Sequence, residues 1–112
     1  MTAPRLTTRV VLEERVASPD GAGGEGDHWT AVGVHFIALL ARSAAEGQTG
    51  LREHGAVSYR ATLRHAPHGS AARPRPDQRF REGERIFNIL GVADADDRKQ
   101  WLTCWLEEGA PS

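Results

Sequence analysis

The alternation of apolar and polar residues along the chain predicts a mainly antiparallel β structure. The stretch Arg79–Leu106 holds two apolar runs, Ile86–Val92 and Trp101–Leu106, which are joined by an acidic turn. The first run is rich in β-branched and aromatic residues without helical spacing, as is typical of strands. A turn containing Gly83 precedes it, so the whole stretch is expected to form an antiparallel meander. Its expected core residues are Phe87, Ile89, Trp101 and Cys104.

Three earlier segments show the same period of two. We expect strands over Leu6–Val16, from His28 to about Ala38, and over Val57–Arg64. The core residues expected from these strands are Val10, Leu12, Trp29, Val34, Phe36 and Leu63. The second strand is followed by good helix formers, which predict a helical turn or short helix over Leu39–Glu46, ended by Gly47.

Polar segments rich in glycine or proline separate these strands. Flexible loops are expected at about residues 17–27, 41–56 and 65–77. The length of 112 residues fits a single domain over 1–112. The fold class is therefore expected to be mainly β: a small antiparallel β-barrel with long loops and one short helix. Closure of a barrel would also satisfy edge strands that otherwise invite aggregation.

Composition and charge narrow the range of partners. With 39% apolar residues the core is small, so assembly with other subunits would add stability. A net charge of −1 argues against general attraction to nucleic acids or acidic lipids. Between Arg60 and Arg85, however, seven arginines face only three acidic residues. Because few aromatic residues are interleaved with them, a surface facing solvent or protein is favoured over a nucleic-acid platform.

No candidate for catalysis, cofactor binding or metal binding emerges, and no enzyme is expected. The glycine-rich loop lacks the GxxxxGK[ST] pattern, and its acids would repel phosphate. His65 and His68 could begin a metal site, but no further ligands follow at ordered spacing. Solvated loop histidines are the favoured interpretation. Cys104 lies in an apolar run and is expected to be a buried structural thiol. The N-terminus lacks an apolar signal segment, so synthesis in the cytosol without membrane contact is expected.

The order of the strand motifs is similar to that of a known family. An early RVVLEERV strand precedes a glycine-rich turn, and Trp29 opens a strand that ends in FIAL. The third strand reads YRATLR, and Arg79 precedes a glycine turn. An R-x-F-x-I pattern with a following valine then leads into WLTCWLEE. Over about residues 5–108 this set resembles the phage head–tail joining proteins, also called head–tail adaptor, head-closure or stopper proteins. The arginine-rich composition and the WLTCWLEEG ending look most like the gene transfer agent version.

This resemblance implies a structural role. Such proteins form a homo-oligomeric ring, with six copies favoured and twelve possible, in the neck of a virion or phage-like particle. The ring lies between a portal or adaptor protein above and a tail terminator or tail tube protein below. It helps to retain the packaged DNA, which passes the channel without sequence-specific binding, and it docks the tail.

The resemblance also assigns contact residues. The loop at about residues 41–56 is implied to face the channel or neighbouring subunits. Its expected interface residues are Arg42, Glu46, Gln48, Leu51, Arg52, Glu53 and His54. On the polar face of the barrel, Arg60, Arg64 and Arg79 are expected to contact partners, because guanidinium groups pair well with carboxylates. The sequence departs from the family pattern in the spacing around Glu46 and in the proline-rich stretch Pro67–Pro76.

A second function stays open at this point. A small barrel of the OB or SH3-like type that binds single-stranded nucleic acid would also carry a basic strand face. It would be recognised by oligonucleotide binding with a steep dependence on salt.

Overall fold

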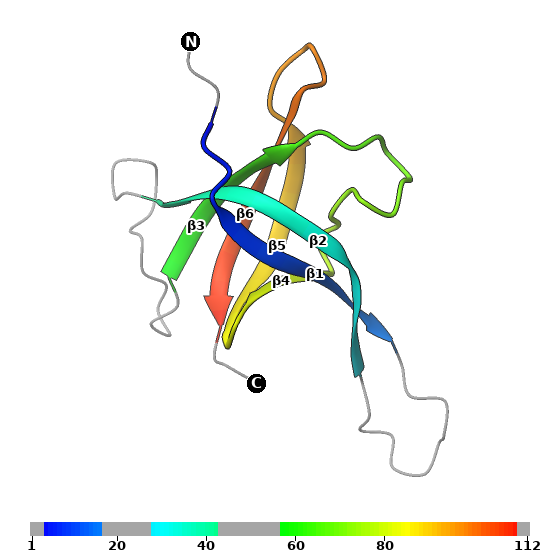
Figure 1. Ribbon diagram of the computed structural model, residues 1–112, viewed down its shortest axis with the longest axis vertical. Coiled ribbons are helices and arrows are strands. Elements are labelled where there is room, and N and C mark those ends of the chain that lie inside the picture. The colour runs from blue at the N-terminus through cyan, green and yellow to red at the C-terminus, as the bar shows by residue number, and fades with distance from the viewer. Residues whose placement is uncertain (1–3, 17–27, 43–56, 110–112) are drawn as a thin grey trace.

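The chain folds into a closed antiparallel barrel. The computed structural model describes residues 4–16, 28–42 and 57–109, and within these ranges it contains strands and no helix (Figure 1). The strands are β1 (Thr8–Val16), β2 (His28–Ala41), β3 (Val57–Arg64), β4 (Arg79–Glu82), β5 (Arg85–Asp94) and β6 (Trp101–Gly109). They pair in the order β1-β2-β3-β6-β5-β4, and β4 returns to β1. The expected mainly β barrel is confirmed.

The meander of β4, β5 and β6 is confirmed as well. Glu82 pairs with Arg85, so that only Gly83 and Glu84 form the turn between β4 and β5. Gly83 has a φ of 61°, which a two-residue hairpin turn with glycine in its first central position requires. The alternation of β5 is interrupted by a bulge between Ile89 and Gly91. Leu90 still follows the regular alternation and points outward next to the buried Ile89, and beyond the bulge Val92 packs against the core.

Three of the six strand pairings span only three or four residues, and one of these three is the β4–β5 hairpin. β1 meets β4 only over Val11–Glu13, and β2 meets β3 only over Ala38–Ala41. By contrast, β1 and β2 pair along their whole common length, from Thr8 to Val16 on β1. The ends of β1 and β2 consequently extend past the barrel as a two-stranded arm (Figure 1).

The core lies inside the barrel and takes one side chain in two from each strand. Of the expected core residues, Val10, Leu12, Leu63, Phe87, Ile89 and Cys104 are confirmed as buried. Other core residues, which the sequence analysis did not single out, include Ile37, Ala61, Phe80, Leu102 and Leu106. Phe80 comes from the short strand β4, where it faces Leu12 of β1 across the closing pair. Packing in the apolar interior therefore helps to hold the short β1–β4 pairing, the closing seam of the barrel, in place.

The core assignment of Val34 and Phe36 was wrong. Their exposed fractions are 48% and 51%, and they lie on the outer face of β2. The register with β1 shifts so that Leu12 pairs with Gly33 while Glu13 pairs with Ala31. Beyond this bulge His35, Ile37 and Leu39 point inward. Because β2 is apolar on both faces, its alternation alone could not show which face is buried.

Trp29 and Trp101, also expected in the core, are only half-buried. Trp101 lies opposite Arg64 on the outer face of β3 and β6, with the guanidinium 5.6 Å from the centre of the indole ring. The helix expected from Leu39 is wrong at its start, because β2 runs on to Ala41. The rest of that helix lies outside the described residues, as do the loop at 17–27 and most of 41–56.

The proline-rich loop between β3 and β4 is anchored on the barrel. Arg73 and Pro74 are buried within it. The guanidinium of Arg73 donates to the Ala66 carbonyl and to the Asp94 carboxylate, both at 3.1 Å. The segment expected as a loop at 65–77 is thus held to the barrel through Arg73 and Pro74, whereas Pro67 and Pro76 are exposed.

Two phenylalanines on opposite sides of the barrel wall offer a direct test of this packing. We expect Phe87→Ala to lower the free energy of unfolding by about 3–5 kcal/mol, because it empties a fully buried site. The matched change Phe36→Ala removes the same atoms from an exposed face, and its expected effect is below about 1 kcal/mol. Urea unfolding of both variants measures the difference. Equal losses would contradict the assignment of the two faces.

Candidate interaction surface

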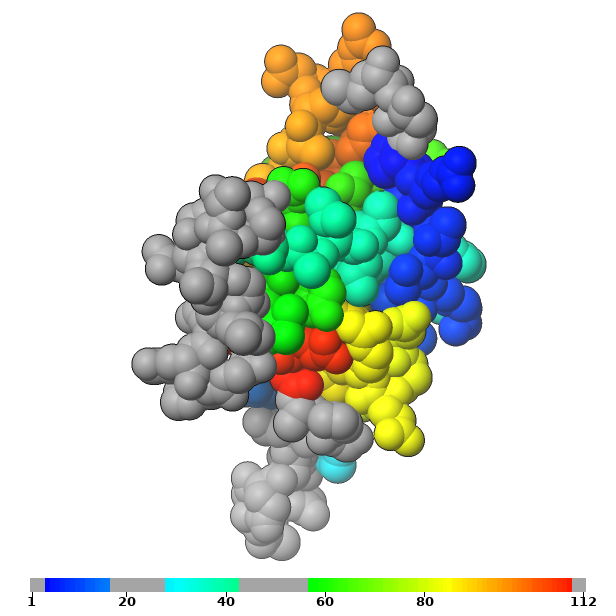
Figure 2. All heavy atoms as spheres, turned by 90° about the vertical axis from the view of Figure 1, so that its left-hand side faces the viewer, coloured from blue at the N-terminus to red at the C-terminus, as the bar shows by residue number. Residues whose placement is uncertain are grey.

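The outer wall of the barrel carries large apolar side chains. The most exposed are Val16, Val34, Phe36, Leu40, Leu90 and Trp105. Val34, Phe36 and Leu40 share the outer face of β2, and we name these three residues the β2 ridge. Figure 2 shows β2 and β3 side by side at the surface on this side of the molecule. A contiguous row of exposed apolar side chains is typical of a protein–protein contact.

Arginines without carboxylate partners border this row. Arg9 lies opposite Phe36, and Arg60 lies between Leu40 and Trp105 in the cross-strand pairing. Within residues 4–16, 28–42 and 57–109, no carboxylate forms an ion pair with Arg9, Arg60 or Arg64. The other side of the barrel differs, since its arginines are paired: Arg73 with Asp94, Arg75 with Glu14, Arg79 and Arg81 with Glu13, and Arg85 with Glu108.

Arg60 and Arg64 are thus accessible to a partner protein, whereas Arg79 is not. Arg79 is 6% exposed, and its Nε donates to Glu13 Oε1 at 2.7 Å. Its guanidinium lies 4.0 Å from the centre of the Trp29 ring. Glu13 Oε2 accepts a second bond from Arg81 at 3.1 Å. Arg79 therefore holds β4 onto β1 and β2, and its assignment as a partner contact is corrected.

The expected loop interface is mostly outside the described residues. This applies to Glu46, Gln48, Leu51, Arg52, Glu53 and His54. Arg42 is described, and its backbone N–H donates to the Ser58 carbonyl at 3.0 Å. This bond extends the pairing of β2 and β3 by one residue beyond Ala41.

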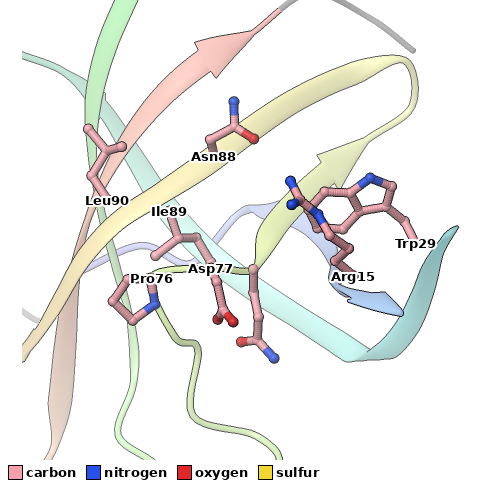
Figure 3. A pocket seen from close by; sticks show the side chains of 8 residues that line it. Arg15, Trp29, Pro76, Asp77, Asn88, Ile89 and Leu90 are labelled. Carbon is pink, nitrogen blue, oxygen red and sulfur yellow. The ribbon is translucent and has the colours of Figure 1, made fainter. Parts of the chain in front are cut away.

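A cavity lies where Arg15 of β1 and Trp29 of β2 approach the start of β4 and the middle of β5 (Figure 3). Its volume is about 330 Å³, and it is lined by Arg15, Trp29, Pro76, Asp77, Gln78, Asn88, Ile89 and Leu90. Asp77 is 83% exposed, and its carboxylate makes only a long contact of 3.9 Å with Arg75. We name this hollow the β5 cavity. Its lining is half polar and half apolar, and it carries both the Arg15 guanidinium and the Asp77 carboxylate.

Two isolated groups have shifted acidities. Cys104 is buried as expected, and burial raises the pKa of its thiol to about 12. Burial lowers the pKa of His35, and a hydrogen bond to the backbone of Ala72 opposes the shift only in part. His35 lies against Phe80 with the rings nearly perpendicular.

The loop histidines do not form a site of their own. His65 is mostly buried and lies 3.4 Å from the Asp94 carboxylate, so it is not solvated as expected. The Arg73 guanidinium holds the pKa of Asp94 below its usual value, and His65 adds to this effect. Among the described residues, no group of three or more His, Cys, Asp or Glu side chains could hold a metal ion. The same part of the chain has no helix long and apolar enough to cross a bilayer.

Several surface residues were missed in the sequence analysis. Leu40 was expected in a helix, and Leu90 was read as part of a buried run. Trp105 and Asp77 carried no distinguishing signal. The one usable signal was the nearly continuous apolar stretch of β2, broken only by His35 between Ala31 and Ala41, since a strand of this kind needs cover on both faces.

These features define a class of protein, namely a small closed antiparallel β-barrel with large apolar side chains exposed on its outer wall. A family model described as "Phage head completion protein" matches residues 1–109. The chain therefore belongs to the phage head completion protein family, which is structural. The resemblance seen in the sequence is confirmed.

Solved structures agree with this assignment. A chain in the structure titled "Virion of native gene transfer agent (GTA) particle" is 42% identical, with a TM-score of 0.77, and the match covers 96% of this chain and 99% of that one. Protein SF1141 from Shigella flexneri 2a shares the fold with a TM-score of 0.71 at 18% identity, over the full length of both chains. No curated protein sequence matches the chain.

The ion pairs of Glu13 are expected to stabilise the seam. Glu13→Gln would leave the nearly buried Arg79 guanidinium without its counter-charge, at a cost of about 3 kcal/mol in the free energy of unfolding. Glu84→Gln at the exposed hairpin turn is the matched control and should change little. Chemical denaturation compares the two. A loss in Glu13→Gln no larger than in the control would show that the pairs do not hold the seam.

His35 should make stability depend on pH near neutrality. Because its pKa is lower in the folded state, the unfolded state binds more protons, and stability falls as the pH drops below about 6.5. The loss is complete once the pH is below the folded-state pKa. His35→Gln should reduce the difference in unfolding free energy between pH 7.5 and 5.5. An unchanged difference in this variant would assign the effect to other groups.

Proposed function

We propose that this protein is a head-closure, or stopper, subunit of a tailed phage or gene transfer agent particle. It forms a ring between the portal or adaptor protein and the tail, where it helps to retain DNA and docks the tail. The observation that carries the proposal is the 42% identity, over nearly the full length of both chains, to a chain of a gene transfer agent virion. Membership of the head completion family points to the same role.

The physical character of the molecule supports this role. A ring subunit needs a rigid frame with two different contact surfaces. The closed barrel supplies the frame. The β2 ridge and the β5 cavity supply two surfaces of different shape and charge. The role requires contacts and no chemical step, so we infer that the protein is not an enzyme.

A second candidate, binding of single-stranded nucleic acid, is favoured by one observation. Arg60 and Arg64 lie opposite Trp105 and Trp101 on the outer face of β3 and β6. Alternating guanidinium and indole groups can stack bases and contact phosphates. The neighbouring β2 ridge argues against it, because an apolar row gains nothing from a phosphate backbone.

Removal of the gene from a strain that makes the particles tests the proposal. We expect tailless heads that have lost their DNA, together with free tails, in place of joined particles, counted by electron microscopy, and a restored gene should return joined particles. Normal particles without the gene would refute the role. Tight, salt-dependent binding of the purified protein to an oligonucleotide, without capture by tailless heads, would favour the second candidate.

The loop between β2 and β3 is tested in the same system. The deletion of Gln48–His54 should leave the melting temperature of the purified protein nearly unchanged, because the barrel pairings lie outside it. We expect it to stop head–tail joining. Joined particles in normal number would contradict the interface proposed for this loop.

A further inference from the structure

One part of the outer wall combines indole rings with arginines. Arg60 of β3 pairs with Trp105 of β6, and four residues further along β3, Arg64 pairs with Trp101. Leu40 of β2 lies on the other side of Arg60 and extends the first of these two rows. We name these five residues the Arg–Trp face. Figure 2 shows β2, β3 and β6 next to one another on this side of the molecule.

The composition of the Arg–Trp face is typical of a protein contact. Tryptophan and arginine are among the residues most enriched at the positions that carry the binding energy of interfaces. Trp105 and Leu40 are 36% and 54% exposed, and Arg64 is exposed as well. A partner that covers these side chains removes apolar surface from water, which favours binding.

Two side chains of the face are already held in place in the free chain. The guanidinium of Arg64 lies 5.6 Å from the centre of the Trp101 ring. The Trp105 indole lies against the backbone of β5, since a Cβ atom placed on Gly91 would be 3.7 Å from its Cε3 atom. Side chains that are ordered before binding lose less conformational entropy in the complex. The face is therefore arranged for contact within a single chain.

The charge of the face indicates the chemistry of its partner. Among the described residues, no carboxylate forms an ion pair with Arg60 or Arg64. On the other side of the barrel, by contrast, Glu13 and Glu14 neutralise arginines of β4 and of the loop before it. Guanidinium groups beside exposed apolar side chains are complementary to a protein surface on which carboxylates surround an apolar side chain.

A second copy of this chain does not match that description. Two Arg–Trp faces in contact would bring like charges together, which disfavours an isologous contact. A head-to-tail contact would need carboxylates from the strands of another wall. Those carboxylates already bind arginines of their own chain, as the ion pairs of Glu13, Glu14, Glu82, Asp94 and Glu108 show.

We infer that the Arg–Trp face binds a protein of the head, through carboxylates of that protein that surround an apolar side chain. This inference rests on the proposed function and names the surface that makes the first contact of head closure. A closure subunit meets the head as a free chain, whereas the tail meets a completed ring. A surface that is complete within one chain therefore serves the contact with the head.

Capture of the purified chain by tailless heads measures this contact. The heads come from the strain that lacks the gene, and residual DNA is removed with nuclease. We expect Arg60→Glu and Arg64→Glu each to lower the affinity at least about tenfold, because each variant places a carboxylate against the carboxylates of the partner. Arg98→Glu, at the exposed turn between β5 and β6, makes the same change in net charge and is the matched control.

The apolar part of the face is tested in the same assay. Leu40→Ala should lower the affinity for heads several-fold, because it removes an apolar side chain that the partner covers. Val16→Ala truncates another exposed apolar side chain, far from the Arg–Trp face on β1, and should have no effect. Melting temperatures of all variants show whether they are folded.

A photoreactive residue identifies what covers the face. Thr103 lies between Trp101 and Trp105 on the outer face of β6, so its replacement by benzoylphenylalanine leaves both indoles in place. Irradiation with tailless heads should give a covalent product with a head protein, identified by mass spectrometry. A product of two copies of the 12.2 kDa chain would place a second copy at the face and overturn the inference. A product formed with free tails and not with heads would overturn it as well.

The remaining outcomes separate this inference from the proposed function. Capture of Arg60→Glu and Arg64→Glu with the affinity of the unmodified chain would overturn the inference and leave the head-closure role in place. Binding of the unmodified chain to an oligonucleotide that is lost in both variants, while their capture by heads is unchanged, would assign the face to nucleic acid and overturn it too. Absence of the unmodified chain both from captured heads and from purified particles would instead refute the head-closure role itself.

Discussion

The structure depends on one closing seam, where β1 meets β4 over three residues. Few backbone hydrogen bonds are available there, so side chains carry much of the closure. Glu13 binds both Arg79 and Arg81 of β4, and Arg79 lies flat on Trp29 of β2. Beneath this cluster Phe80 fills the barrel interior. Ion pairs on the outer face and apolar packing in the interior thus both hold the four-residue strand β4 in place. Because β4 closes the barrel, it also maintains the curvature of the other five strands.

Much of the fold could be predicted from the sequence, because turns and alternation agree along most of the chain. The meander from β4 to β6 follows from Gly83 and from the apolar runs that flank it, and β3 alternates without interruption. The exception is β2, which is apolar on both faces. A bulge near Gly33 decides which residues turn inward, and this depends on pairing with β1 rather than on local preference. Val34 and Phe36 were misplaced for this reason.

The candidate interaction surface was harder to predict from the sequence than the fold. Arg60 and Arg64 were recognised because an alternating strand places them outside. Arg79 belongs to a similar strand, yet it is buried, since Glu13 from a distant part of the chain neutralises it. The β5 cavity joins residues from β1, β2, the proline-rich loop and β5. No pattern within a single segment could indicate such a site, because only barrel closure brings these segments together.

The short pairing between β2 and β3 has a consequence for the free protein, before it is incorporated into a particle. From His28 to Ile37, β2 forms no ladder with β3, so one of its edges lacks interstrand hydrogen bonds to any described strand. This edge has neither proline nor charged residues, the usual protection against edge-to-edge aggregation. The free chain is therefore at risk of aggregation in proportion to its concentration. Synthesis in step with the availability of its binding partners would keep that concentration low.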